Sequence, residues 1–537
     1  MVTNKVIDGV GILPESANEE LINFVIPDGV KEIERNEFLD CKKLKSVVLP
    51  NTLNKIHDGA FKGCENLETI SIPDSVNFIG SDAFSKCRSL KNVTLPTKIT
   101  NIESFAFFCC ERLENISIPD SVTSISVNAF YGCKSLKRIT ISANVTQIES
   151  GAFVNCGSLE SIEVAEDNKT YDSREGCNAI IETATNTLIR GCSSTVIPEN
   201  IQVIERFAFS GSTMKEIEIP ESVREIGEGV VNYCNNLERI VVAEGNETYD
   251  SREGCNAIIE TATNTLISGC GTTVIPDSVH AIARRAFLGT NLEEIVVPNG
   301  VTGLYMVFTD CKNLKKIVLP NSVREIYRGA FSGCSSLQSI VLSNGLTRVC
   351  GFKGCSSLQT IELPDSITTI DIDAFQDCTS LKNIVIHNNI TEIDSCAFEN
   401  CTSLQSIVIP ESVCSLGCDA EGTFKGCSNL TDVTILSTSI DKTPESMFEG
   451  CKKLKEITLP KGIKKIGRRT FADCEELETI TLPVGIAKIN EDAFDGCKKL
   501  KTIYVPAKKA DYYKMRLSEE LHSLIVELVP EKKAKKK

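Results

Sequence analysis

Residues 110–133 read CERLENISIPDSVTSISVNAFYGC, and the rest of the chain repeats this frame. The frame starts again 23 residues after Cys110, at Cys133. A unit of this length cannot bury its own apolar residues, so it has to stack on copies of itself. A fixed period of this kind is typical of a solenoid.

Within residues 116–119 the two isoleucines alternate with a polar residue, which predicts a strand with one buried face. Pro119 then ends the strand because it has no N–H to donate. Residues 122–125 place two more branched side chains inside, and residues 129–130 predict a short helical turn whose ring fills the interior. We therefore predict an α/β solenoid whose successive parallel strands stack about 4.8 Å apart.

An aromatic residue closes each unit and gives a count of about 18 coils of about 23 residues. The series is Phe38, Phe61, Phe84, Phe107, Phe130, Phe153, Phe209, Val231 in place of Phe, Phe287, Phe308, Phe331, Phe352, Phe375, Phe398, Phe424, Phe448, Phe471 and Phe494.

Two segments interrupt the count, at about residues 165–197 and 243–275. They share an identical run of twenty residues, 170–189 and 248–267. Each run has two apolar stretches around Thr-Ala-Thr-Asn, which predicts a β-hairpin leaving the solenoid. Two full repeats separate the inserts. At about 4.8 Å per strand they should leave the same edge within roughly 10–15 Å of each other.

The sequence also predicts the boundaries of the solenoid and the character of the segments at its two ends. We expect residues 1–26 to form an N-terminal cap and residues 27–506 to form the solenoid, because an open terminal coil would expose its core. Residues 507–529 have helical spacing and predict a C-terminal helical cap. Residues 530–537 are rich in lysine and predict a disordered tail.

The chain has 25 cysteines, of which sixteen recur at the position of Cys133. A residue at one place in every coil predicts a buried ladder of reduced thiols, and the parallel Cβ vectors of such a ladder disfavour disulfides. No C-x-x-C pair is present and histidines number four, which disfavours a metal site. The hairpins leave two interpretations open for Cys177 with Cys192 and for Cys255 with Cys270: free thiols or a disulfide in each.

Composition and motifs argue against several classes of function. The net charge of −15 disfavours nucleic acid as a partner. No apolar run is long enough to insert in a membrane, and the first thirty residues contain no secretory signal. Compartment stays open between the cytoplasm and the cell surface, since a leader removed earlier would leave the same sequence. No catalytic or cofactor motif occurs, so we expect neither an enzyme nor a cofactor.

The side chains that point outward from the strands are the remaining candidates. Most are Val, Thr or Ser, which suits either an exposed sheet with no ligand or a platform for another protein. An acidic stretch around Glu163, Glu216, Glu218 and Glu294 lies beside the inserts. Both inserts also carry the run Tyr-Asp-Ser-Arg, and Tyr and Arg are residue types enriched at binding hot spots. Simple copying would also explain the identical runs. The candidate partner-binding residues are Glu163, Glu216, Glu218, Arg239, Glu294, Tyr171, Arg174, Tyr249 and Arg252.

The pattern Leu-x-x-Ile-x-Ile-Pro-x-x-Val-x-x-Ile-x-x-x-Ala-Phe-x-x-Cys resembles the BspA-type leucine-rich repeat, also named for a treponemal protein. The resemblance covers about residues 24–506. It implies a right-handed, curved solenoid with a parallel sheet on the concave side, as in bacterial surface or secreted proteins, some of them adhesins.

The expected function is therefore a non-catalytic, adhesin-like scaffold that binds protein through the concave sheet and the hairpins. The resemblance extends the range of partners to host or matrix proteins, and we expect a monomer. The alternative is a structural or surface-coat protein without a specific ligand.

Overall fold

The structure is a computed structural model that describes residues 21–417 and 422–529. The predicted basic tail and residues 1–20 of the predicted N-terminal cap lie outside these ranges. The chain divides into two compact units. The first comprises residues 1–262 and 266–273, and the second comprises residues 263–265 and 274–537.

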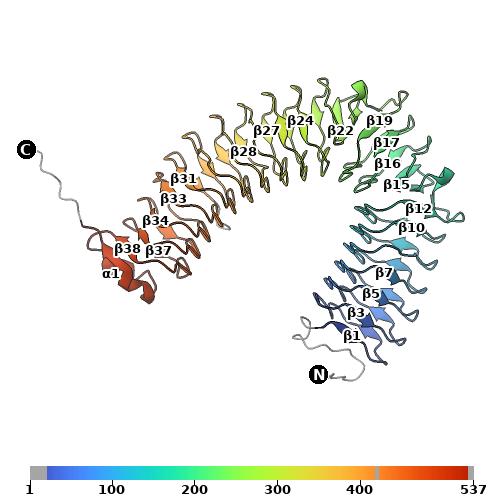
Figure 1. Cartoon of the computed structure of the whole chain (residues 1–537), viewed down its shortest axis with the longest axis horizontal. Coiled ribbons are helices and arrows are strands. Elements are labelled where there is room, and N and C mark those ends of the chain that lie inside the picture. Colours follow the sequence, from blue (N-terminus) through green and yellow to red (C-terminus); the bar gives the residue numbers. More distant parts are fainter. Residues whose placement is uncertain (1–20, 418–421, 530–537) are drawn as a thin grey trace, which may run out of the picture. The chain divides into compact units, whose positions relative to one another are not determined.

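Over these described residues the architecture is a β-solenoid of about 22 turns of about 23 residues, with parallel sheets and almost no helix. Figure 1 shows the strands of successive turns lying side by side within each unit. The predicted solenoid is confirmed, but the count of 18 coils is too low because it passed over the inserts and the end turns.

The predicted helical contribution is also too large. Ala129 and Phe130 lie in a turn between Asn128, with φ 54°, and Gly132, with φ 74°. These left-handed residues stop a right-handed helix from forming on either side of the ring. The described helical elements are α1 Ala510–Lys514 and the 3₁₀ turns η1 Arg174–Gly176, η2 Arg252–Gly254 and η3 Glu519–Leu524.

Most turns of the first unit carry a longer strand and a two-residue strand. The longer strands are β1 Asn23–Val25, β3 Ser46–Val48, β5 Thr69–Ser71, β7 Asn92–Thr94, β10 Arg138–Ile141, β12 Ser161–Val164, β17 Glu216–Ile219 and β19 Arg239–Val242. The short strands are β2 Glu32–Ile33, β4 Lys55–Ile56, β6 Phe78–Ile79, β8 Asn101–Ile102, β9 Ser124–Ile125, β11 Gln147–Ile148, β16 Val203–Ile204 and β18 Glu225–Ile226.

The second unit repeats this arrangement. Its longer strands are β24 Glu294–Val296, β26 Lys316–Val318, β31 Ser406–Ile409, β33 Asp432–Ile435, β34 Glu456–Thr458, β36 Thr479–Thr481, β38 Thr502–Val505 and β39 Ile525–Glu527. Its short strands are β23 Ala281–Ile282, β25 Gly303–Leu304, β27 Glu325–Ile326, β28 Arg348–Val349, β29 Thr369–Ile370, β30 Glu392–Ile393, β32 Ser415–Leu416, β35 Lys465–Ile466 and β37 Lys488–Ile489.

Parallel pairing keeps equivalent residues of successive turns in register. Ser46 pairs with Thr69 and Thr69 pairs with Asn92. Because the side-chain period of a strand is two, this register sends the same repeat position inward in every turn. Ile70 and Val93 are buried, whereas Thr69 and Asn92 are exposed.

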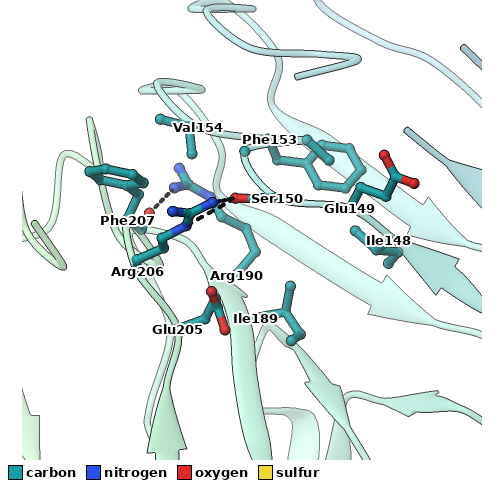
Figure 2. Close-up of a pocket in the computed structure, with 12 residues that line it drawn as sticks. Ile148, Glu149, Ser150, Phe153, Val154, Ile189, Arg190, Glu205, Arg206 and Phe207 are labelled. Atoms are coloured by element: carbon teal, nitrogen blue, oxygen red, sulfur yellow. Dashed lines mark hydrogen bonds between the residues drawn. The ribbon is translucent and has the colours of Figure 1, made fainter. Parts of the chain in front are cut away.

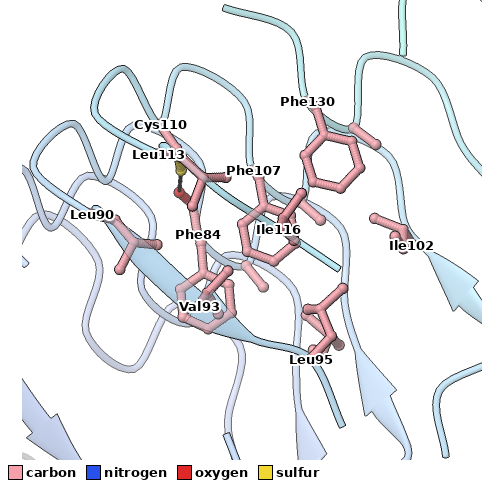
Figure 3. Close-up of a cluster of buried hydrophobic side chains, with 14 of the residues drawn as sticks. Phe84, Leu90, Val93, Leu95, Ile102, Phe107, Cys110, Leu113, Ile116 and Phe130 are labelled. Carbon is pink, nitrogen blue, oxygen red and sulfur yellow. Dashed lines mark hydrogen bonds between the residues drawn. The ribbon is translucent and has the colours of Figure 1, made fainter. Parts of the chain in front are cut away.

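Stacked phenylalanine rings fill the interior in two runs, from Phe38 to Phe153 and from Phe287 to Phe494. Leucine, isoleucine and valine from both kinds of strand lie around them (Figure 3). The rings of Phe107 and Phe130 lie 5.4 Å apart with their planes at 4°, and those of Phe130 and Phe153 have the same spacing and angle. Phe130 has no exposed surface. Within these two runs the ring of each turn therefore packs against the rings of its neighbours, which makes each of these turns dependent on the next.

The repeated cysteines form a ladder of free thiols beside these stacks, and all of them are buried except Cys497, which is half-buried. The Cys110 Sγ donates a hydrogen bond to the carbonyl of Phe84 at 3.2 Å, and the Cys133 Sγ donates to Phe107 at 3.3 Å. Figure 3 shows the first of these bonds. All described cysteines are free, so the disulfide interpretation of the hairpin pairs, Cys177 with Cys192 and Cys255 with Cys270, is not supported.

The inserts do not leave the solenoid as predicted. They comprise β13 Tyr171–Asp172, β14 Ala179–Glu182 and β15 Thr187–Gly191 in the first copy, and β20 Tyr249–Asp250, β21 Ala257–Glu260 and β22 Thr265–Gly269 in the second. β14 and β15 form the predicted antiparallel hairpin, but β15 also pairs in parallel with β16. The insert thus takes a place in the short-strand sheet, because Ile180, Ile181 and Leu188 are all fully buried and need cover on both sides.

The segment predicted as a C-terminal helical cap contains α1, η3 and β39. β39 pairs in parallel with β38, with Ile525 opposite Ile503, and so continues the long-strand sheet. The Tyr513 ring of α1 is buried. Its hydroxyl donates to the carbonyl of Pro483, which joins this segment to the preceding turns.

Candidate functional site

The exposed face of the long strands is the first candidate surface of the first unit. Over β3, β5 and β7 it forms an open groove of about 550 Å³. Short side chains without charge line this groove, among them Ser46, Val48, Thr69, Ser71, Asn92 and Thr94. Nothing bulky projects from this part of the sheet, so a second macromolecule can approach it closely.

The acidic stretch lies further along the same face and is partly neutralised. Glu216 lies opposite Arg239 in the register of β17 and β19, and its Oε2 is 3.2 Å from the Arg239 Nη1. Glu163 on β12 is 3.9 Å from Arg138. Glu218 is exposed and lies opposite Val241. The stretch therefore mixes paired and exposed carboxylates.

Glu294 belongs to the second unit, where it begins β24 and lies opposite Lys316 of β26. The adjacent residues form an ion pair, with the Lys315 Nζ 2.9 Å from Glu293. Carboxylates of this unit thus also have basic neighbours in the next turn.

The insert tyrosines are buried and so do not present their rings to a partner. The Tyr171 hydroxyl accepts a hydrogen bond from the Ile148 N–H at 2.9 Å. The Tyr249 hydroxyl accepts one from the Ile226 N–H at 3.1 Å. Each ring therefore connects its insert to the turn before it.

The insert arginines are held within their own segments. The Arg174 Nε and Nη2 bind both carboxylate oxygens of Asp172 at 2.8 and 2.6 Å. Burial opposes ionisation of Asp172, but the bonds from Arg174 and Thr183 outweigh burial and hold the pKa of Asp172 below its ordinary value. Arg252 binds Asp250 in the same way. These arginines stabilise the inserts, which leaves Glu163, Glu216, Glu218, Arg239 and Glu294 as the exposed candidates.

A cavity of about 190 Å³ beside the first insert was not foreseen (Figure 2). Residues 148–154, 189–190 and 205–207 line it. The side chain of Arg190 enters it from β15, and that of Arg206 enters from the turn after β16. One signal was available in the sequence: the identical runs end at Ile189, and Arg190 stands where the second copy has Ser268.

The two arginines differ in their surroundings. Arg190 is 3% exposed, and its Nη1 and Nη2 donate to the carbonyls of Phe207 and Ser210, both at 3.0 Å. Its Nε has no hydrogen-bond partner. Arg206 is exposed, and its Nε and Nη2 donate to the Ser150 hydroxyl at 3.1 and 2.8 Å.

Residues 21–417 and 422–529 contain no group of three or more His, Cys, Asp or Glu side chains able to hold a metal ion. In the same ranges no helix has the length and apolar character to cross a membrane.

A family model described as the BspA type leucine rich repeat region matches six times, at residues 16–111, 54–175, 189–305, 264–351, 350–421 and 420–514. Among curated proteins, no sequence matches the chain.

Several solved structures are similar. A leucine-rich repeat protein from Eubacterium ventriosum is 23% identical with a TM-score of 0.41, over 63% of this chain and 83% of that one. One from Bacteroides ovatus is 21% identical with a TM-score of 0.35, over 98% and 100%. The T. pallidum leucine-rich repeat protein is 30% identical with a TM-score of 0.28, over 35% and 80%.

Proposed function

The chain belongs to the BspA-type leucine-rich repeat family, and from this premise we propose that it is a non-catalytic, adhesin-like scaffold that binds another protein. The binding surface is the exposed face of the long strands. As the family resemblance implies, we take this face as the concave side of a right-handed coil within each unit.

The observation that carries the proposal is the register of the outward side chains. Thr69 pairs with Asn92, and Ser71 pairs with Thr94, so equivalent exposed positions form rows across successive strands. Rows of short side chains offer a partner a broad surface whose chemistry changes from turn to turn. Such extended faces are how solenoids bind macromolecules.

The acidic stretch determines which kind of partner this surface prefers. Glu216 and Glu218 are exposed on β17, and the one basic side chain directly opposite them in β19 is Arg239. Because ion pairs at exposed positions are worth little, Glu216 can exchange Arg239 for a partner's cation at small cost. We therefore expect a partner with a basic surface.

The test is a pull-down with the folded chain from cell lysate and from a set of matrix proteins. Each partner found is then measured against the double variant Glu216→Lys with Glu218→Lys. We expect weaker binding and a shallower dependence on salt, because the reversal repels a basic partner.

The matched control is Glu34→Lys with Glu68→Lys, which makes the same change of charge at exposed carboxylates near β2 and β5. Equal losses in both double variants would show that only net charge matters. A partner that binds the Glu216 and Glu218 variant as tightly as the parent would place its surface elsewhere.

A structural role is the second candidate, and exposed valines of the second unit favour it. Val296 is 62% exposed, and Val318 lies opposite it in the next strand. Val341, one turn further on, is 82% exposed. A row of exposed apolar side chains can mediate association between copies. Sedimentation of the pure chain over a range of concentrations distinguishes the two, since the scaffold proposal expects a monomer.

A further inference from the structure

We propose that the cavity beside the first insert binds a carboxylate attached to a short apolar body, with Arg190 and Arg206 as the groups that hold the carboxylate (Figure 2). This site is separate from the exposed sheet face, so the proposal stands or falls independently of the scaffold function.

The first argument is an uncompensated buried cation. Arg190 is almost fully buried, yet it bonds two neutral carbonyls and leaves its Nε without a partner. Within the described residues, neither Arg190 nor Arg206 forms an ion pair with a carboxylate. Keeping a guanidinium away from water without a counter-ion costs free energy. An anion in the adjoining cavity would recover part of that cost.

Burial also disfavours the charged form of Arg190, and it lowers the pKa of the guanidinium from its ordinary value. The groups that oppose this effect are the thiols of Cys156, Cys234 and Cys192. Burial raises the pKa of Cys156 to about 11, so this thiol is neutral and supplies no negative charge near pH 7.

The second argument is the shape and lining of the cavity. Figure 2 shows the guanidinium groups of Arg190 and Arg206 together at its centre. Ile148, Ile189 and Phe207 are half-buried around them and present apolar surface. Guanidinium groups bind the planar carboxylate through paired hydrogen bonds. A volume of about 190 Å³ suits one carboxylate with a few apolar carbon atoms.

Two carboxylates of the protein, Glu149 and Glu205, also line the cavity, and their surroundings differ. Glu149 accepts hydrogen bonds from the Val127 N–H and the Gln147 amide, both at 3.0 Å, which directs it to neighbouring side chains and backbone. Glu205 lies at the side of the cavity and is half-buried. Its charge repels a bound anion and should reduce the affinity.

The third argument comes from comparing the two copies. The segments are identical over residues 170–189 and 248–267, and they then differ at Arg190, where the second copy has Ser268. Ser150, which Arg206 binds, corresponds to Glu228 in the second copy. At these two positions the first copy gains a positive charge and lacks a negative one. It also carries Glu149 and Glu205 where the second copy has Gly227 and Ala283, so the buried guanidinium of Arg190, and not the net charge of the lining, distinguishes the first insert as an anion site.

The experiment is calorimetric titration of the full chain with 4-methylpentanoate, with N-acetyl-leucine and with the neutral 4-methylpentanamide. We expect at least one acid to bind and the amide to fail, because the arginines require a negative charge. Arg190→Ser, which installs the residue of the second copy, and Arg206→Gln should each weaken binding by about tenfold or more.

Two variants sharpen the result. Arg284→Gln changes the residue that corresponds to Arg206 in the second copy and should leave the affinity unchanged. Glu205→Gln should tighten binding by removing a like charge. Thermal unfolding of each variant checks that it folds, and Arg206→Gln, at an exposed position, remains informative if Arg190→Ser does not fold.

The outcomes separate the sources of the carboxylate. Binding of 4-methylpentanoate alone supports a free small acid, and binding of N-acetyl-leucine alone supports the carboxyl terminus of another protein. Binding of the amide as tightly as the acids overturns the proposal. Failure of both acids to bind, or equal binding by Arg206→Gln and the parent, overturns it as well.

Discussion

At the scale of single residues, the ladder thiols act as hydrogen-bond donors inside the core. The Phe107 carbonyl accepts from the Cys110 N–H of its own turn at 3.2 Å and from the Cys133 thiol of the next turn at 3.3 Å. A buried carbonyl can accept two such bonds with its two lone pairs. Serine would fit this pattern chemically, but the larger, less polar sulfur also fills space beside the ring.

Burial also makes stability depend on alkaline pH. It raises the pKa of Cys156 to about 11 and of Cys355 to about 12, from an ordinary value of 9.0. The folded chain therefore holds these protons at pH values where the unfolded chain has lost them. The contribution of these thiols to the free energy of unfolding should be constant below about pH 8 and should fall as pH rises toward 12, because the unfolded state binds fewer protons. Urea titrations between pH 7 and about 11 measure this fall.

The control is the exposed thiol of Cys414, which has no part in the core. Cys414→Ser should leave the pH dependence unchanged, whereas Cys355→Ala should make it shallower. A free energy of unfolding that stays level up to pH 11 would contradict the buried ladder.

The same burial predicts an order of chemical modification. Among the described cysteines, Cys414 is exposed, and Cys109 and the last ladder cysteine, Cys497, are half-buried. These three should react with a thiol reagent before the buried ladder cysteines. Peptide mass spectrometry after brief alkylation of the native chain gives the order. Early labelling of Cys133 or Cys334 would show that the core opens more readily than its packing implies.

At the scale of elements, the first insert depends on a close approach between β15 and the Phe209 ring of the next turn. A Cβ atom on Gly191 would lie 2.1 Å from the Phe209 Cε1, and Phe209 is fully buried. Gly191→Ala should therefore lower the free energy of unfolding by about 1–3 kcal/mol through overpacking. Denaturant unfolding of the variant measures the loss.

Gly303 of β25 is the matched control, since the nearest atom to a Cβ there is 3.7 Å away. Gly303→Ala should be tolerated, or should stabilise by about 0.4–1 kcal/mol by restricting the unfolded chain. Equal losses of unfolding free energy in Gly191→Ala and Gly303→Ala would show that the close approach at Gly191 does not matter for stability.

The insert tyrosines give a second prediction at this scale. Tyr171→Phe removes the acceptor of the Ile148 N–H and leaves that donor without its partner. We expect a loss of about 1–3 kcal/mol and faster hydrogen exchange of the Ile148 amide. Tyr249→Phe should act in the same way on Ile226.

Tyr305 provides the comparison, because it is 45% exposed. Removing its hydroxyl should change stability by less than about 0.5 kcal/mol. Unaltered exchange of the Ile148 amide in Tyr171→Phe would show that the buried bond does not hold the insert in place.

The sequence predicted the hairpin of each insert but not its place in the fold. The two apolar stretches around Thr-Ala-Thr-Asn are a local signal and predict the pairing of β14 with β15. The pairing of β15 with β16 depends on how the ends of the insert meet the neighbouring turns. No periodicity in the sequence records that contact, so the burial of the Tyr171 ring could not be predicted.

At the scale of the whole molecule, stability is a sum over turns and their interfaces. Phe130→Ala removes a ring packed on both sides in the first unit, and Phe375→Ala does so in the second, where Phe398 lies 5.5 Å away. Each should cost about 3–5 kcal/mol. Hydrogen exchange should rise in the neighbouring turns of the same unit and much less in the other unit.

If either substitution accelerated exchange to the same extent in both units, the chain would unfold as one cooperative body. If the turns beside Phe130 kept their exchange rates, the ring would contribute little to the core.

The repeat made most of the architecture predictable. The spacing of Phe107, Phe130 and Phe153 places each ring over the last, and the alternation in residues 116–118 gives the buried face of the strand. The candidate site was less predictable. The ion pair of Glu216 with Arg239 requires the register of two strands, and the cavity at Arg190 exists only where an insert meets two turns.

The thiol bonds between turns have a consequence for how such a chain changes over generations. The bond from the thiol to the preceding phenylalanine spans 26 residues for Cys133, 24 for Cys355 and 29 for Cys427. The hydrogen bond from the thiol to the phenylalanine carbonyl is kept while the number of residues between the two varies. Gain or loss of one full turn returns each thiol to a phenylalanine carbonyl, so duplication can lengthen or shorten the molecule without redesigning its interior. Related chains can therefore differ in the number of turns, and so in length, while they keep the same core residues in each turn.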